Sequence, residues 1–136
     1  MTLFVDASAI VAMIAREPEA VPFAERLGHS DAKHTSPIAI WEAVRAVVRV
    51  RGVDLIEARD LVATFLRDAG VEVMPIGATH GELALDAYAA FGKGRHAAAL
   101  NMGDCFAYAR AKASRASILF KGNDFARTDL TDGTLE

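Results

Sequence analysis

The sequence predicts an α/β protein with three layers, in which a central, mainly parallel sheet is flanked by helices. Short apolar segments with strand character at residues 3–5, 71–74 and 118–120 alternate with longer segments that have helical periodicity. This alternation is typical of a parallel sheet covered by helices. An acidic residue also follows the first and the last of these strands closely, at the sheet edge where α/β proteins bind their ligands.

Composition and charge narrow the class of protein. Residues 1–136 are expected to form a single domain, because this length can bury a core without disulfides. No apolar stretch approaches the roughly 20 residues that span a bilayer, and the N-terminus lacks the features of a secretory signal. Cys105 is the only cysteine, so we expect a cytoplasmic protein without a disulfide framework. The net charge of -3 does not favour a nucleic-acid binder, although 11 of its 15 cationic residues are arginines, which suit phosphate contacts.

The first strand, at residues 3–5, leads directly into Asp6, and a helix follows to about residue 15. On this stretch alone, Asp6 is more simply explained as the cap of that helix than as part of a binding site. A second helix is expected at residues 21–27, ending at Gly28, before a short strand at residues 33–35.

A longer helix is predicted at residues 37–51, because Ser36 is a good N-cap and Pro37 suits the first helical position. Glu42 lies beside the apolar stripe of this helix, and Arg45 and Arg49 follow it three and seven residues later on the same face. This spacing fits a row of surface salt bridges, worth only tenths of a kcal/mol. It fits equally a carboxylate at a cleft, with two cations beside it for a phosphate backbone.

The middle of the chain continues the alternation. Asp54 and Glu57 resemble a capping box at the start of a helix that ends at Gly70, and the alternating residues 71–74 form a strand, which we expect in the middle of the sheet. Thr79 and Glu82 form a second candidate capping box. The basic loop at residues 92–96 lacks the spacing of a P-loop, and is either an ordinary mobile loop or a phosphate contact.

The last helix and strand bring two further acids. Asn101 is a good N-cap, and Asp104 lies in the first turn, where the helix dipole stabilises a carboxylate. The strand at residues 118–120 then leads into a turn that holds Asp124, as the first strand leads into Asp6. Asp6, Glu42, Asp104 and Asp124 are therefore expected to meet at one edge of the sheet. Clustered carboxylates without soft ligands favour Mg²⁺ or Mn²⁺, and such sites hydrolyse phosphodiesters.

Four short blocks of the sequence, in order along the chain, resemble the motifs of a known protein family. Residues 4–9 (FVDASA), 36–42 (SPIAIWE), 100–109 (LNMGDCFAYA) and 119–125 (LFKGNDF) resemble, in this order, the PIN-domain ribonucleases, in particular the VapC toxins of bacterial toxin–antitoxin pairs. The resemblance implies a PIN-like fold, metal-dependent cleavage of single-stranded RNA, inhibition by a cognate antitoxin and a homodimer. Trp41, Phe65 and Leu66 are candidates for the apolar dimer surface.

The resemblance also implies roles for individual residues. Asp6, Glu42 and Asp104 match acidic positions of the family and would hold Mg²⁺ or Mn²⁺, while Ser8 matches a small polar residue near the metal. Asn123 stands where relatives can carry an acid, so Asp124 is the expected fourth acid and Asp129 the outside candidate. A water activated by the metal would attack the RNA phosphorus. Candidate contacts to the RNA backbone are Arg45, Arg49, Lys93 and Arg95.

Two other functions are compatible with the same residues. One is a PIN-like module that binds RNA or protein without catalysis, and the four intact acids argue against it. The other is a receiver domain, which gathers acids and Mg²⁺ around a phosphorylated Asp at the end of a middle strand. The strand at residues 71–74 ends in Pro75 and Ile76 without an Asp, which argues against a receiver.

Overall fold

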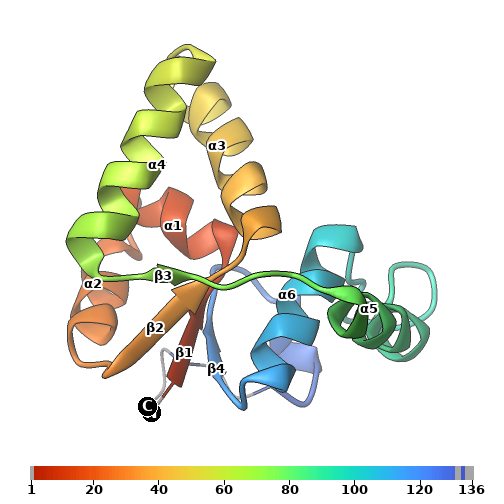
Figure 1. The fold of residues 1–136 in the computed structure, drawn as a ribbon. Coiled ribbons are helices and arrows are strands. Elements are labelled where there is room, and N and C mark those ends of the chain that lie inside the picture. Colours follow the sequence, from red (N-terminus) through yellow and green to blue (C-terminus); the bar gives the residue numbers. More distant parts are fainter. Residues whose placement is uncertain (1, 131–132, 134–136) are drawn as a thin grey trace.

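Four parallel strands form one sheet in the order β3-β2-β1-β4 (Figure 1). This computed structural model describes residues 2–130 and 133. The strands are β1 (Thr2–Val5), β2 (Ala32–Thr35), β3 (Glu72–Val73) and β4 (Ser117–Leu119). The parallel sheet confirms the predicted fold class, and it places the carboxyl ends of all four strands at the same edge.

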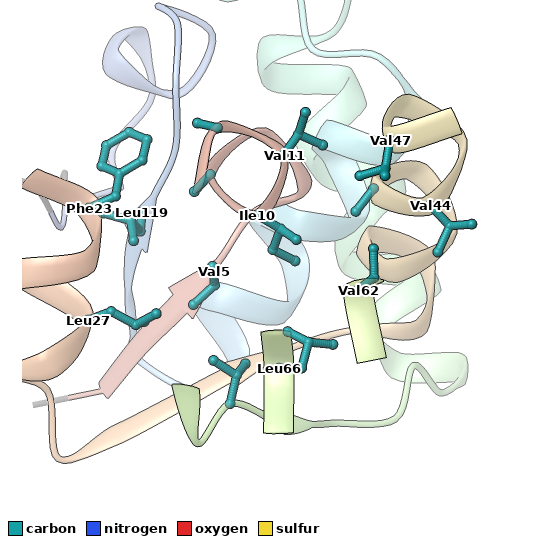
Figure 2. Close-up of a cluster of buried hydrophobic side chains, with 14 of the residues drawn as sticks. Val5, Ile10, Val11, Phe23, Leu27, Val44, Val47, Val62, Leu66 and Leu119 are labelled. Atoms are coloured by element: carbon teal, nitrogen blue, oxygen red, sulfur yellow. The ribbon is translucent and has the colours of Figure 1, made fainter. Parts of the chain in front are cut away.

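Helices cover both faces of this sheet. One face packs against α1 (Ala7–Ile14), α2 (Ala20–Gly28), α3 (Pro37–Arg51) and α4 (Leu55–Ala69), and the other against α5 (Ala78–Phe91) and α6 (Met102–Ala113). Successive side chains of a strand point to opposite faces. Leu3 and Val5 of β1 therefore lie in the first core, shown in Figure 2, whereas Phe4 lies in the second.

Three predicted N-caps begin helices in the structure. Ser36 accepts a hydrogen bond from the Ala39 N–H at 3.1 Å, and Asp54 accepts one from the Glu57 N–H at 2.8 Å. Asn101 caps α6 in the same way. At the other end of α4, Gly70 has a φ of 70°, the left-handed conformation that favours glycine at helix ends. Local sequence therefore fixes where these helices begin and end.

Two predicted helix ends are wrong. Gly28 is the last residue of α2 rather than the residue beyond it, and His29 is the C-cap. Helix α5 starts at Ala78 with Gly77 as its N-cap, so Thr79 and Glu82 do not form a capping box. The side chain of His80 takes over this role, because its Nδ1 accepts a hydrogen bond from the Gly77 N–H at 2.9 Å.

The position of β3 is also different from the prediction. This strand is the edge strand of the sheet beside β2, not a middle strand, and both of its residues are exposed. The middle strands are β2 and β1, and β1 leads directly into Asp6. A receiver has its phosphorylated Asp at the end of a middle strand, so the absence of an Asp after the edge strand β3 is no argument against a receiver domain.

One of the three residues expected at an apolar dimer surface, Leu66, is not available there. Leu66 is buried in the core between α4 and the sheet, and Phe65 is partly buried against the same core. Trp41 is 57% exposed. Within residues 2–130, no helix has both the length and the apolar character needed to cross a membrane.

Candidate active site

The four predicted acids come from two helices and two connecting segments around the carboxyl edge of the sheet. Asp6 lies between β1 and α1, Glu42 is in the second turn of α3, Asp104 is in the first turn of α6, and Asp124 precedes the short 3₁₀ helix Phe125–Arg127 that follows β4. The pKa values of the first three are each raised by at least one other carboxylate of the group. The structure therefore brings the four acids together.

Asp6 is both a helix cap and a member of this acid group. Its Oδ2 accepts hydrogen bonds from the Ser8 N–H at 3.0 Å and from the Ser8 hydroxyl at 2.6 Å, which caps α1. The Ser8 Oγ in turn accepts a hydrogen bond from the Lys121 N–H at 2.9 Å. This chain of contacts fixes the carboxylate between the ends of β1 and β4. Burial raises the pKa of Asp6, the Ser8 hydrogen bonds oppose that shift, and the charge of Asp124 adds to it.

Asp104 has the same double role at the start of α6. Its backbone N–H donates to the Asn101 Oδ1 at 2.9 Å, and its own Oδ2 accepts a hydrogen bond from the Asn101 N–H at 3.1 Å. This capping box leaves the other carboxylate oxygen available. Burial, together with the charges of Asp6 and Asp124 and a hydrogen bond to the Asp124 side chain, raises the pKa of Asp104 to about 7.

Glu42 reaches the group by packing its carboxylate against the backbone of Gly103. A Cβ added at Gly103 would overlap the Glu42 carboxylate, so only glycine leaves room for it there. Burial, followed by the charges of Asp6 and Asp104, raises the pKa of Glu42 to about 7. Among the described residues, neither Arg45 nor Arg49 forms an ion pair with Glu42. The row of salt bridges that the spacing allowed is therefore absent.

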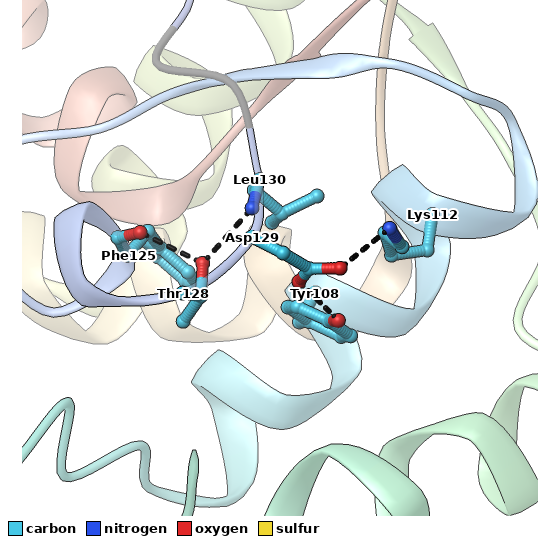
Figure 3. Close-up of polar contacts among 6 residues, drawn as sticks. All are labelled: Tyr108, Lys112, Phe125, Thr128, Asp129 and Leu130. Carbon is cyan, nitrogen blue, oxygen red and sulfur yellow. Dashed lines mark hydrogen bonds and ion pairs between the residues drawn. The ribbon is translucent and has the colours of Figure 1, made fainter. Parts of the chain in front are cut away.

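The structure separates Asp124 from Asp129, the two candidates for the fourth acid. The side chain of Asp124 does not cap the helix that follows it, and its charge contributes to the raised pKa of Asp104. Asp129 instead accepts hydrogen bonds from the hydroxyl of Tyr108 and from Lys112 Nζ, the latter at 2.8 Å (Figure 3). These two contacts lower the pKa of Asp129. The expectation that Asp129 caps a helix or is only solvated is wrong, because it forms an ion pair on the surface of α6.

Two of the four predicted RNA-contacting cations line a groove beside the acids. This groove, with a volume of about 500 Å³, lies between α1 and α3. It is lined by Ser8, Trp41, Glu42, Arg45, Arg49 and Lys121, among others. Lys93 and Arg95 do not line it. Both are exposed in the loop between α5 and α6, where the Arg95 guanidinium lies 5.7 Å from the centre of the Tyr88 ring.

The chemistry of the acid group fits a hard divalent cation, although its side chains are not arranged as a finished ligand set. Within the described part of the chain, no three His, Cys, Asp or Glu side chains lie in positions that could hold one ion directly. All four donors are nevertheless carboxylates, which Mg²⁺ and Mn²⁺ prefer, and Mg²⁺ keeps several of its waters in protein sites. Burial is the largest cause of the raised pKa values of Asp6, Glu42 and Asp104, and the charges of neighbouring carboxylates add to it, a repulsion that a cation would relieve.

Comparisons with known proteins decide the family. The model of the PIN domain matches residues 3–130. The chain belongs to the PIN-domain family. It is 45% identical to a VapC ribonuclease of Rhizobium meliloti (strain 1021), over 93% of this chain and 98% of that protein. It is also 36% identical to ribonuclease VapC30 of Mycobacterium tuberculosis, over 94% of this chain and 95% of that protein.

The PIN-domain fold is supported independently by a solved structure. The crystal structure of Mycobacterium tuberculosis VapC20, described as a toxin that cleaves the sarcin-ricin loop, superposes with a TM-score of 0.75 and covers 96% of this chain and 97% of that one. At 16% identity, this likeness shows the fold. Membership in the PIN family, with VapC ribonucleases as relatives, excludes the receiver-domain alternative.

Two residues near the acids escaped the sequence argument. Gly103 belongs to the predicted helix start, and no signal in the sequence marks it as the position where the Glu42 carboxylate packs. Lys121 links β4 to Ser8 through its backbone, and its Nζ forms ion pairs with Glu17 at 3.0 Å and with Glu19 at 3.5 Å. No pattern in the sequence joins Lys121 to Glu17, which lies 104 residues earlier.

Proposed function

We propose that this PIN-domain protein is a VapC-type toxin, an endoribonuclease that hydrolyses RNA phosphodiester bonds with the help of Mg²⁺ or Mn²⁺ and is neutralised by a cognate antitoxin. The observation that carries the proposal is the meeting of Asp6, Glu42, Asp104 and Asp124 at the carboxyl edge of the sheet. The relatives named as VapC ribonucleases support the same activity. The substrate is RNA, and we expect the protein to act in the cytoplasm.

Asp6, Glu42 and Asp104 would hold the cation, in part through its waters, and Asp124 would support it or a second ion. When bound, the cation activates water as a nucleophile and stabilises the charge that develops on the phosphate. The protein contributes the orientation of the acids. Ser8 holds Asp6 through two hydrogen bonds, Asn101 holds Asp104, and the backbone of Gly103 receives Glu42.

Protonation of the acids follows from the same geometry. Burial and the charges of neighbouring carboxylates raise the pKa values of Glu42 and Asp104 to about 7, so each of these two groups is partly protonated near neutral pH. Cation binding requires these protons to leave, because the ligands must be deprotonated. Binding of Mg²⁺ should therefore release protons and strengthen as the pH rises through about 7.

The cations beside the site would hold the RNA backbone. Arg45 and Arg49 line the groove that includes Glu42, so phosphates on either side of the scissile bond can reach them. Lys93 and Arg95 stay predictions without such support. Ser8 is close enough to Asp6 to act mainly by positioning that carboxylate, at 2.6 Å.

Assembly is a further part of the proposal. We expect a homodimer, and Leu85, Tyr88 and Met102, which are exposed and line one pocket between α5 and α6, are apolar side chains that a second copy could bury. Light scattering at micromolar concentration tests this expectation, and a monomer would contradict it. The antitoxin would act by covering the acid group or the groove beside it.

Cleavage of RNA by the purified protein tests the proposed activity. Wild type and Asp6→Asn, purified identically, are incubated with total RNA in Mg²⁺ or in EDTA, and the new RNA ends are sequenced. We expect defined cuts only for wild type in Mg²⁺, without the 2′,3′-cyclic phosphates that attack by a ribose hydroxyl would leave. Equal cleavage in EDTA would refute the metal dependence. RNA binding without any cleavage would instead support a non-catalytic PIN module.

A further inference from the structure

We propose that Trp41 is a stacking platform for an RNA base next to the scissile phosphate, and that Arg49 contacts a neighbouring phosphate of the same strand. The inference deepens the proposed function and rests on it. It assigns the groove between α1 and α3 to single-stranded RNA. It also gives a role to the most exposed aromatic side chain among the described residues that border the acids.

The groove reaches the acid group at Glu42. One wall is the face of α3 that carries Trp41, Glu42, Arg45 and Arg49, and the other comes from α1 with Ser8, next to Lys121. Figure 1 shows α1 and α3 packed side by side beyond the carboxyl ends of the strands. Its volume of about 500 Å³ lies in the range of roughly 300–1,000 Å³ that holds small ligands, which leaves room for a nucleotide.

The state of Trp41 suits a base rather than the protein core. Its side chain is 57% exposed, although large aromatic side chains are usually among the most buried. The Arg45 guanidinium lies 4.8 Å from the centre of the ring, which fixes the indole from one side and leaves further ring surface open to solvent. Aromatic side chains next to cations are how single-stranded nucleic acids are bound without a fixed sequence.

The charges of the groove favour a phosphate backbone. Within the described part of the chain, Arg45 and Arg49 have no ion-pair partner, whereas Lys121 is neutralised by Glu17 and Glu19. Two unneutralised arginines side by side are notable in a protein with a net charge of -3. Arg49 lies two helical turns beyond Trp41, roughly 12 Å along the helix axis at 1.5 Å per residue, so a base and a neighbouring phosphate can be held together.

The experiment uses the single tryptophan of the chain as its probe, in an Asp104→Asn background that holds RNA without cutting it. Short oligoribonucleotides are added in Mg²⁺, and tryptophan fluorescence and the anisotropy of labelled RNA are recorded together. We expect RNA to quench the fluorescence, and an abasic strand of equal length to bind more weakly with little quenching. Trp41→Ala should weaken RNA binding roughly 5- to 150-fold, the range measured for loss of one stacked base, and Trp41→Phe should recover most of it.

Ile56→Ala is the control, because Ile56 is also a large, exposed apolar side chain but lies outside the groove. It should bind RNA like the Asp104→Asn parent. The slope of the logarithm of the RNA-binding constant against the logarithm of salt concentration should become less steep for Arg49→Ala, by about the amount that one phosphate contact contributes. Unchanged RNA affinity of Trp41→Ala, or equal quenching by the abasic strand, would overturn the proposal.

The outcomes separate this inference from the proposed function. If wild type cleaves RNA but Trp41→Ala keeps the RNA affinity of its parent, the ribonuclease activity is supported and the stacking role of Trp41 is refuted. If RNA quenches the fluorescence of Trp41 but wild type never cleaves RNA, the stacking role is supported and the catalytic proposal is refuted. If Trp41→Ala keeps its RNA affinity but no longer co-purifies with an antitoxin, the groove binds protein, and the RNA platform is refuted.

Discussion

Replacement of Gly103 by alanine should separate the function of the acid group from the stability of the fold. The added Cβ would overlap the Glu42 carboxylate and no backbone atom of another element lies closer. The end of a glutamate side chain is flexible, so Glu42 should swing away from Asp6 and Asp104 while the helices stay in place. The substitution therefore moves the Glu42 carboxylate out of the site, although none of the four acidic residues is itself replaced.

Gly103→Ala should leave the stability of the fold unchanged or slightly higher, but it should weaken the binding of Mg²⁺. Alanine is favoured over glycine by at most about 1 kcal/mol within a helix, and the departing charge relieves repulsion, so the melting temperature should stay equal or rise slightly. Loss of a supporting group typically costs a metal site about 10- to 100-fold in affinity. The Mg²⁺ concentration for half-maximal cleavage should rise by this factor for Gly103→Ala.

Gly81→Ala is the control, because a Cβ at this position of α5 meets no atom within 4 Å. Thermal unfolding and Mg²⁺ titration of RNA cleavage are measured for both variants. Gly81→Ala should keep the Mg²⁺ dependence of wild type. A Gly103→Ala variant with wild-type Mg²⁺ dependence would show that the Glu42 carboxylate is not used where the structure places it.

Three further predictions concern the acids themselves. Asp6→Asn and Asp104→Asn should each abolish cleavage yet stay folded by circular dichroism, because asparagine still caps a helix; native activity in either would refute its role. In the metal-free protein, the raised pKa of Glu42 means that the folded state keeps a proton that the unfolded chain releases. The melting temperature should therefore fall as the pH rises from about 4.5 through about 7, and fall less for Glu42→Gln; a rise over this range would contradict the burial. Asp124→Ala should raise the Mg²⁺ requirement for cleavage roughly tenfold or more, whereas Asp129→Ala should change it little. The reverse order would make Asp129 the fourth acid.

The positions of the acids were predictable because capping is local chemistry. Asp6 is the N-cap of α1 and Asp104 belongs to the capping box of α6, and a helix start at the carboxyl edge of a parallel sheet is already at the binding edge. The cap and a place among the acids are compatible for Asp6, because Asp6 caps α1 through Oδ2 and still interacts electrostatically with neighbouring carboxylates. Its role in a binding site stays a prediction.

Sheet order and long-range packing were not predictable in the same way. Central β2 is polar in sequence. Two of its polar side chains are nevertheless buried against β1, because Thr35 donates a hydrogen bond to the Val5 carbonyl at 2.8 Å and His34 stacks edge-on against Phe4. The alternating pattern of β3 did contain a sign of its edge position, since central parallel strands are usually continuously apolar. Helical spacing placed Glu42 beside Arg45, whereas its actual neighbour is Gly103, from a helix sixty residues later.

The location of a bound cation tests the central claim most directly. Crystals of the wild-type protein soaked in Mn²⁺ are measured at a wavelength where manganese scatters anomalously, with Asp104→Asn crystals as the control. The account predicts an anomalous peak among Asp6, Glu42, Asp104 and Asp124 in wild type, and a weaker or absent peak in the variant. A peak elsewhere on the protein, or no peak among these four carboxylates at saturating Mn²⁺, would contradict it.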